Sequence, residues 1–312
     1  MWQPGATLPT LQRRAALLAN LRRFFFDKKV LEVDVPLLGA STVTDVHLSA
    51  PSATIARQTH YLQTSPEFFM KRLLAAGSGD VYYLGKAVRD DEVGRYHNPE
   101  FTMLEWYRLG YSDARLIDEV CELFRFLSIA ESCRRISYRS LFLDYYSVDP
   151  HLASAKDLEK IARSHMEFSW EEDAKSTWLD LLFSHGIEPN LQALTVVYDY
   201  PECQSALAKV SEDETGTTVA KRFEVFWRGI ELANGYWELT DADLQRARFE
   251  DDLSTRKVLG MAQPEIDEKL MAAMKAGLPE CAGIALGVDR LLLALTEQES
   301  LDEVMPFSGV RL

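Results

Sequence analysis

One carboxylate stands in an otherwise apolar run, FTMLEWY at residues 101–107. If this run is a strand, alternation places Glu105 on the face of Met103 and Tyr107, with Glu105 and Tyr107 roughly 7 Å apart along it. A carboxylate buried among apolar side chains is unfavourable unless it has a partner. An internal salt bridge would supply that partner, and so would the ammonium group of a ligand. The pattern alone leaves both open.

A second β-rich run, RFEVFWRGIELANGYWEL at residues 222–239, carries two more carboxylates. Continued alternation predicts Glu231 on the face of Val225 and Trp227, with Glu238 beyond a turn at the Asn-Gly pair. Two carboxylates near a strand end suit Mg²⁺, which takes one or two of them together with substrate phosphates. Most pairs of glutamates lie in solvent and bind no metal. The pattern therefore indicates a magnesium site only if a phosphate-binding element lies beside it.

Arginines in two places could provide that element. Arg89 ends the run VYYLGKAV and precedes a polar loop with Arg95 and His97. The planar guanidinium fork suits phosphate oxygens. Near the C-terminus, ALGVDRLLL places Gly287 at a turn into a helix, with Arg290 in the first helical turn, a position favourable for nucleotide contact. A solvated loop and an ordinary helix start are the alternatives.

Composition narrows the function classes. The 312 residues are 47% hydrophobic and 26% charged, as in ordinary globular proteins, and contain no apolar run of membrane-spanning length. The net charge of −14 disfavours binding that rests on neutralising nucleic-acid phosphates. No P-loop, GxSxG or HExxH pattern is present, which argues against P-loop, serine-hydrolase and zinc chemistry. The four cysteines are scattered and predict reduced thiols in a cytoplasmic protein.

The elements that must position these residues are readable in part. Helical spacing predicts a helix over residues 11–25 and alternation a strand over residues 31–35. Residues 64–77 predict a loop and a helix, capped by Ser65 or Thr64, with Pro66 in the first turn. Two strands, 81–88 and 101–107, are predicted to form an antiparallel hairpin, and residues 113–135 a helix. We predict one α+β domain over residues 1–312, an antiparallel sheet flanked by helices.

Three segments, in this order, resemble the signature motifs of class II aminoacyl-tRNA synthetases. They are the strand ending in proline (VDVPLL), the arginine–loop–strand unit (VRDDEVGRYHNPEFTMLEWY) and the terminal helix start (GIALGVDRLL). HNPEFTMLEWY, TSPE and GIELANGYWELTDA are most similar to the lysyl branch. The likeness covers nearly the whole chain and is least in residues 140–195. It implies the class II catalytic fold, ATP as substrate and Mg²⁺ as cofactor.

The resemblance also implies roles for individual residues. Arg89 would hold the α-phosphate and Arg290 the γ-phosphate, both as catalytic groups, and Glu231 and Glu238 would hold the metal. The full set of implied ATP contacts is Arg89, Asp90, Asp91, His97, Asn98, Glu231, Leu232, Gly287 and Arg290. The implied amino-acid contacts are Ser65, Pro66, Glu67, Glu105, Tyr107, Glu238 and Ala285.

Within this set, the side chains of Glu105 and Tyr107 would reach the distal ammonium of lysine. Asp91 and Val88 depart from the family's usual Glu and Phe, which leaves the adenine contact open. Ala285 stands where lysyl-tRNA synthetases tend to have Gly. Its methyl would narrow the pocket at the α-carbon, and we expect this to favour an amino group on the β-carbon.

The first motif begins by residue 30, which leaves no room ahead of it for the anticodon-binding barrel of lysyl-tRNA synthetases. The chain is therefore similar to the short paralogues that attach lysine or (R)-β-lysine to a lysine of translation elongation factor P. That likeness implies a homodimer, no tRNA anticodon contact and no membrane. A minimal enzyme that charges tRNA, and a non-catalytic regulator that binds amino acid or nucleotide, are the alternatives.

Overall fold

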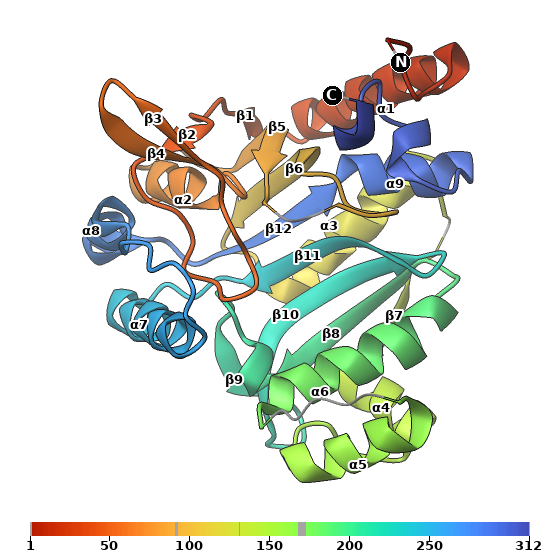
Figure 1. Cartoon of the computed structure of the whole chain (residues 1–312), viewed down its shortest axis with the longest axis vertical. Coiled ribbons are helices and arrows are strands. Elements are labelled where there is room, and N and C mark those ends of the chain that lie inside the picture. The colour runs from red at the N-terminus through yellow and green to blue at the C-terminus, as the bar shows by residue number, and fades with distance from the viewer. Residues whose placement is uncertain (1, 91–92, 131, 168–172, 312) are drawn as a thin grey trace. The chain divides into compact units, whose positions relative to one another are not determined.

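The computed structural model describes residues 2–90, 93–130, 132–167 and 173–311 (Figure 1). The chain divides into two compact units: unit 1, Met1–Ser112 with Leu239–Leu312, and unit 2, Asp113–Glu238. The sequence predicted a single domain over residues 1–312. This division into two compact units does not test that prediction. Among the described helices, none is both long and apolar enough to cross a lipid bilayer.

Four strands of unit 1 are neighbours in one sheet, and three more form a small separate sheet. The larger set has the order β1 (Leu31–Glu32), β5 (Val81–Val88), β6 (Glu100–Leu109) and β12 (Cys281–Gly287). β6 is antiparallel to β5 and β12, whereas β1 is parallel to β5. The small sheet has the order β2 (Leu38–Gly39), β4 (Gln58–Leu62) and β3 (Ser52–Ile55). The predicted hairpin of residues 81–88 and 101–107 is confirmed.

Five α-helices of unit 1 are described, and short 3₁₀ turns follow the last of them. The helices are α1 (Leu8–Asp27), α2 (Glu67–Ala75), α7 (Ala242–Val258), α8 (Glu268–Gly277) and α9 (Val288–Thr296). The turns are η4 (Leu301–Glu303) and η5 (Gly309–Arg311). Figure 1 shows α1 and α9 near the two chain ends. Phe25 of α1 stacks on Tyr82 and meets Trp106 edge-on, so α1 covers β5 and β6 with its apolar face.

Two local predictions for unit 1 need correction. Only Leu31–Glu32 of residues 31–35 is a strand, and the Leu31 side chain is 54% exposed rather than on a buried face. The Val33 N–H still donates to the Tyr82 carbonyl, but Pro36, three residues on, has no backbone donor with which to continue such pairing. Pro66, rather than Ser65 or Thr64, is the N-cap of α2, and its side chain makes no capping hydrogen bond.

Unit 2 carries the second group of strands. Their order is β11 (Ile230–Trp237), β10 (Thr218–Trp227), β8 (Thr195–Pro201) and β7 (Arg134–Ser137), with β9 (Val210–Glu212) on β10. β10 is antiparallel to β8, β9 and β11, and β7 is parallel to β8. The predicted helix over residues 113–135 is too long, because the chain re-enters the sheet at β7.

The helices of unit 2 contribute to a core of mixed aliphatic and aromatic side chains beside these strands. They are α3 (Asp113–Phe126), α4 (Tyr138–Tyr146), α5 (Ala155–His165) and α6 (Lys175–Leu182). Shorter turns are the π-helical η1 (Phe183–Ile187) and the 3₁₀ turns η2 (Glu188–Asn190) and η3 (Glu202–Gln204). Tyr138 stacks on Phe142 and Phe183 in the core that Trp178 and Phe226 complete. Figure 1 shows α4, α5 and α6 gathered beside β7 and β8.

The hairpin of β10 and β11 turns at Arg228 and Gly229, which both have left-handed backbone conformations (φ 56° and 69°). Asn234 and Gly235, predicted to be the turn, lie inside β11 opposite Glu224 and Phe223. The Glu231 side chain therefore lies on the same face of the sheet as that of its cross-strand partner Phe226. The prediction that it shares the face of Val225 and Trp227 is wrong. A bulge at Leu232 shifts the alternation once more.

Candidate active site

The loop before α2 and the end of β5 are joined through Arg89. Its Nε donates to the carbonyl of Thr64 at 3.3 Å, and its guanidinium lies over the Phe101 ring, 5.1 Å from the centroid. The loop that carries Ser65, Pro66 and Glu67 is thus fixed to the arginine predicted to hold the α-phosphate. The planar guanidinium of such an arginine has the fork of N–H donors that suits phosphate oxygens.

Glu67 already has an internal partner. The Nζ atom of the buried Lys71 lies 2.7 Å from its Oε1 atom, one helical turn away. A ligand ammonium at Glu67 would share a carboxylate that a buried lysine already neutralises. We did not predict this pair from the sequence, although the i,i+4 spacing of Glu67 and Lys71 in a predicted helix is the signal that would have revealed it.

Glu105 lies deep in the β5–β6–β12 strands, with 2% of its surface exposed. Its cross-strand neighbours are Tyr83 and Ala285, and its Oε1 atom accepts a hydrogen bond from the Tyr107 hydroxyl at 2.8 Å. Burial raises the pKa of Tyr83, with smaller contributions from the negative charges of Asp34 and Glu105. The predicted face of Glu105 and Tyr107 is confirmed, and the predicted Ala285 lies directly beside them.

The loop after β5 meets the start of α9. Arg290 donates from Nε to the Tyr96 carbonyl at 3.0 Å and from Nη2 to Nε2 of His97 at 2.7 Å. Because a guanidinium only donates, His97 accepts there as a neutral ring protonated on Nδ1. Two residues predicted to contact ATP, far apart in the chain, are therefore neighbours. Arg95 fastens the same loop by donating to the Glu299 carbonyl.

Gly287 ends β12 opposite Met103, and Asp289 locks the helix that follows. The Asp289 carboxylate accepts from Arg14 at 2.5 Å and from the Thr102 backbone at 2.6 Å. These contacts fix the first turn of α9, and hence the origin of the Arg290 side chain, to β6 and α1.

Three further residues of this loop, Asn98, Asp90 and Asp91, were predicted to contact ATP. Both side-chain polar atoms of Asn98 are engaged, Nδ2 with the Glu100 carbonyl and Oδ1 with the Gly309 backbone. Asn98 thus shapes the loop, and its amide already has partners in the chain. The backbone of Asp90 bonds to the Ser49 carbonyl. Asp91 lies outside the described residues.

Unit 2 brings together two carboxylates on one face of its hairpin. Glu224 on β10 accepts from the Tyr200 hydroxyl at 2.7 Å and from Arg222. Burial raises its pKa, the charge of Glu231 adds to this, and Arg222 opposes both. Glu224 was not predicted. A hairpin turn placed at Arg228 and Gly229 would have revealed it, because that register puts both glutamates on the same face.

Asn234 is a second residue that the sequence did not indicate. It lies opposite Glu224, and its Nδ2 donates to the Tyr236 hydroxyl at 2.8 Å. Its buried Oδ1 has no hydrogen-bond partner among the described residues. Leu232 and Glu238 are both buried. The backbone of Glu238 forms an isolated antiparallel β-bridge with that of Ala208.

The chemistry of Glu224 and Glu231 fits a magnesium ion. Within the described part of the chain, no three His, Cys, Asp or Glu side chains gather as a metal cluster. Mg²⁺ does not need such a cluster when a nucleotide supplies phosphate oxygens. A divalent cation would also offset the repulsion between the two carboxylates, which adds to the effect of burial on the Glu224 pKa. The two carboxylates predicted to hold the metal lie farther apart along the chain: Glu231 is half-buried near the start of β11, and Glu238 is buried directly after its end.

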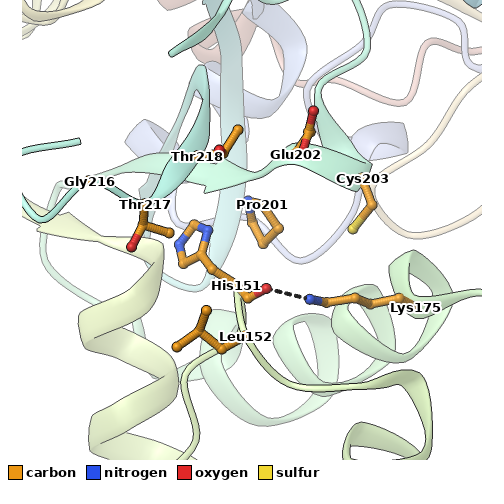
Figure 2. A pocket seen from close by; sticks show the side chains of 9 residues that line it. All are labelled: His151, Leu152, Lys175, Pro201, Glu202, Cys203, Gly216, Thr217 and Thr218. Carbon is orange, nitrogen blue, oxygen red and sulfur yellow. Dashed lines mark hydrogen bonds between the residues drawn. The ribbon is translucent and has the colours of Figure 1, made fainter. Parts of the chain in front are cut away.

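A cavity of about 470 Å³ in unit 2 has a different lining (Figure 2). Lys175 points into it and donates to the His151 carbonyl at 2.8 Å. Burial, together with the charge of Arg139, lowers the pKa of His151, so this ring is neutral at pH 7. None of the residues predicted for the site lines this cavity.

Comparison with known proteins agrees with the motifs. The family model described as tRNA synthetases class II (D, K and N) matches residues 6–311. A protein of Photorhabdus laumondii named elongation factor P--(R)-beta-lysine ligase is 47% identical over 98% of this chain and 97% of its own length. A protein of Proteus mirabilis with the same name is 44% identical over 99% of this chain and 98% of its own.

The family match extends over nearly all described elements of both units. It confirms the predicted class II synthetase fold, α+β with a largely antiparallel sheet flanked by helices. It also explains why three short motifs occur in the expected order along the chain. The protein belongs to the class II tRNA synthetase family, in its D, K and N group.

Proposed function

We propose that this protein is an ATP-dependent ligase that activates lysine or (R)-β-lysine and transfers it to a lysine side chain of translation elongation factor P. The observation that carries the proposal is near-full-length similarity to two proteins named for that reaction. The buried Glu105 and Tyr107 support it, because a carboxylate at that depth suits the distal ammonium of a diamino acid.

The reaction would take two steps. The amino-acid carboxylate attacks the α-phosphorus of ATP and displaces pyrophosphate, which gives an aminoacyl-adenylate. The ε-amine of the acceptor lysine then attacks the activated carbonyl, and AMP leaves as an amide bond forms. No covalent enzyme intermediate is required, so positioning and charge stabilisation supply the acceleration.

The residues of the chain have distinct parts in this proposal. Arg89 holds the α-phosphate and Arg290 the γ-phosphate. His97, hydrogen-bonded to Arg290, keeps that guanidinium oriented before ATP arrives. Glu231 and Glu224 would hold Mg²⁺, which offsets phosphate charge when bound. We include Glu238, Asn234 and Ala285 among the amino-acid contacts.

Partners, oligomeric state and location belong to the same proposal. We expect a homodimer in the cytoplasm that makes no anticodon contact with tRNA. The net charge of −14 supports the last point, because it opposes binding to a polyanion. A non-catalytic regulator is disfavoured, because Arg89, Glu231 and Arg290 are all retained.

The test supplies purified protein with ATP, Mg²⁺ and either lysine or β-lysine. Purified elongation factor P is offered in one reaction and bulk tRNA in another. We expect a lysyl mass gain on elongation factor P alone, with AMP released, and none with the Arg290→Ala variant. Acylation of tRNA alone would instead support the minimal synthetase. Ligand binding without pyrophosphate release would support the regulator.

A further inference from the structure

Two thiols of unit 2 lie beside the same arginine: the Arg135 guanidinium contacts the Cys121 sulfur at 3.7 Å, and Cys133 is two residues before Arg135 in the chain. Cys121 is on α3, and Cys133 immediately precedes β7. Both are free thiols; Cys121 is 8% exposed and Cys133 is half-buried. The proposed ligase chemistry uses neither of them, so their arrangement needs an explanation of its own.

An arginine holds the first of these thiols. Arg135 of β7 donates from Nη2 to Asp118 at 2.6 Å and to the Cys121 sulfur at 3.7 Å. Asp118 and Cys121 are three residues apart on α3, so both present their side chains to the same neighbour. The parallel pairing of Arg135 with Val196 of β8 fixes the backbone from which the guanidinium reaches.

The two sulfurs differ in character as a result. The hydrogen bond from Cys133 lowers the pKa of Cys121 to about 7, with help from Arg135 and against the effect of burial. The pKa of Cys133 is raised, first by the same hydrogen bond and then by burial. Cys121 is the sulfur that the Arg135 guanidinium contacts, so it is the thiol whose ionised form is favoured. A thiol with a pKa near the ambient pH is the most effective attacking thiol.

We propose that Cys121 and Cys133 are a redox-modification site, at which a peroxide oxidises Cys121 and Cys133 then closes a disulfide. This proposal is independent of the ligase reaction. It rests on the contact of Arg135 of β7 with the Cys121 sulfur of α3, and on the place of Cys133 directly before β7 and two residues before Arg135.

The chemistry balances in two steps. The Cys121 thiolate attacks one peroxide oxygen; an S–O bond forms, the O–O bond breaks, and hydroxide or alkoxide leaves. Cys133 then attacks the sulfur of the sulfenic acid; the S–S bond forms, the S–O bond breaks, and the hydroxyl leaves as water with the Cys133 proton. Two thiols lose two electrons in all, and the peroxide gains them.

The disulfide would tie α3 to the edge strand β7. A covalent bond at this place joins a helix to the start of a strand that is otherwise held by pairing with β8 alone among the described strands. Exchange with an external thiol would reverse it.

The test treats the intact protein with hydrogen peroxide, blocks remaining thiols and digests it with trypsin without reduction. We expect peptide 116–125, which contains Cys121, linked to peptide 126–134, which contains Cys133, and release of both by a reductant. Oxidation of Cys121 to the sulfinic acid without this link would overturn the proposal, and so would a link that joins two copies through Cys203.

Variants separate the two roles. In Cys133→Ser, the sulfenic acid on Cys121 should persist and react with a dimedone-type probe, whereas Cys121→Ser should give no probe adduct at Cys133. Cys203→Ser is the matched control: that side chain is exposed, yet desolvation of its sulfur raises its pKa. The control should leave the Cys121–Cys133 link unchanged. Equal labelling of Cys121 and Cys133 in the two single variants would contradict the assignment.

The pH dependence of Cys121 alkylation tests whether Arg135 activates this thiol, because a purely structural contact would leave that dependence unchanged. The rate of Cys121 alkylation by iodoacetamide should rise with pH through a midpoint near 7. In Arg135→Gln, that midpoint should move upward and the rate at pH 7 should fall about threefold or more. The Arg135–Asp118 pair is largely exposed, so the variant should remain folded. An unchanged midpoint would exclude Arg135 as the activating group.

Discussion

Glu105 is a buried carboxyl group with a hydrogen-bond donor beside it. A buried carboxylate among apolar strands needs hydrogen-bond donors or a cation. The Tyr107 hydroxyl supplies one donor at 2.8 Å, from two residues along the same strand. Strand alternation made this neighbour predictable from sequence. The cross-strand neighbour Ala285 was not predictable by alternation, because it comes from a strand 180 residues later in the chain.

Replacing Glu105 by Gln should separate amino-acid binding from nucleotide binding. A hydrogen bond to a charged group contributes about 1.5–3 kcal/mol, so we expect KM for lysine to rise about 10- to 100-fold. KM for ATP should stay within about twofold. ATP–pyrophosphate exchange at varied lysine and ATP concentrations measures both.

Glu100→Gln is the matched control, because Glu100 starts the same strand but is exposed and paired with Lys86. It should leave both constants unchanged. Equal changes in the two KM values for Glu105→Gln would mean that Glu105 supports the structure of the protein and does not bind lysine.

Ala285→Gly tests the origin of amino-acid preference. Ala285 lies opposite Glu105 in the β6–β12 register, so a methyl removed there opens space beside the predicted substrate. One methyl in a pocket discriminates by about 1–3 kcal/mol. We expect the β-lysine over α-lysine preference in kcat/KM to fall about tenfold, measured by adenylate formation. An unchanged ratio would refute this role.

At the scale of elements, local sequence predicted the hairpin of β5 and β6 but misplaced that of β10 and β11. Asn-Gly is a favoured turn pair, yet Asn234 and Gly235 remain extended because their partners Glu224 and Phe223 hold them in the ladder. The actual turn at Arg228 requires a left-handed arginine, which propensity does not favour. Tertiary pairing decided the register, and this is why Glu224 was missed.

Asp289→Asn should loosen the attachment of α9. Asp289 is buried and carries the charge that neutralises Arg14, which is 12% exposed. Removing one partner of a buried pair leaves the other uncompensated, so the free energy of unfolding should fall by about 3 kcal/mol. Because Arg290 follows in the chain, KM for ATP should rise in the protein that remains folded. Urea unfolding and pyrophosphate exchange measure the two effects.

The exposed pair of Arg23 and Asp27 on α1 is the control for this experiment. Its charges are 3.9 Å apart with side chains 74% and 58% exposed, so Arg23→Ala should change stability by less than about 0.5 kcal/mol. A similar loss in both variants would show that Asp289 acts through general charge rather than through its buried contacts.

The turn between β9 and β10 should respond to acid. Burial alone would raise the pKa of Asp213, but hydrogen bonds from Thr215 and Thr217 and the charge of Arg139 outweigh it and lower it to about 2. A carboxyl with a pKa below its unfolded value stabilises the fold above about pH 4, and this contribution is lost as pH falls through 2.

Asp213→Asn should therefore lower the free energy of unfolding by about 1 kcal/mol at pH 7, after allowance for solvent screening. The difference from the parent protein should shrink below pH 4 and vanish near pH 2. Urea unfolding at several pH values measures it. A difference that stays constant across this range would mean that the ionised carboxylate is not the stabilising form.

At the scale of the whole molecule, composition excluded more than it identified. The net charge of −14 argued against an extended nucleic-acid-binding surface, and the absence of P-loop, GxSxG and HExxH patterns argued against three enzyme classes. The ordered motifs then identified the family. Neither could predict the contact of Arg135 with Cys121, because it depends on how α3 packs beside β7 once both elements have formed. The Glu67–Lys71 pair, by contrast, has the i,i+4 spacing of a single helix and could have been predicted from the sequence.

The homodimer in our proposal has a testable surface. The apolar side chains of Leu8 and Phe26 on α1 and of Leu31 on β1 are 69%, 80% and 54% exposed. A stable interface buries about 800 Å² on each partner and has an apolar centre. Phe26 is the largest of these side chains, so Phe26→Asp should place a charge in that centre and weaken association at least tenfold, as measured by sedimentation equilibrium.

Val258→Asp provides the matched control, because Val258 near the end of α7 is 86% exposed and lies on another element. It introduces the same charge into the same unit and should leave the association constant unchanged. Circular dichroism should show both variants folded, since neither side chain contributes to the buried core. If both variants weaken association equally, added negative charge on a chain already at −14 is the cause, and α1 is not the interface.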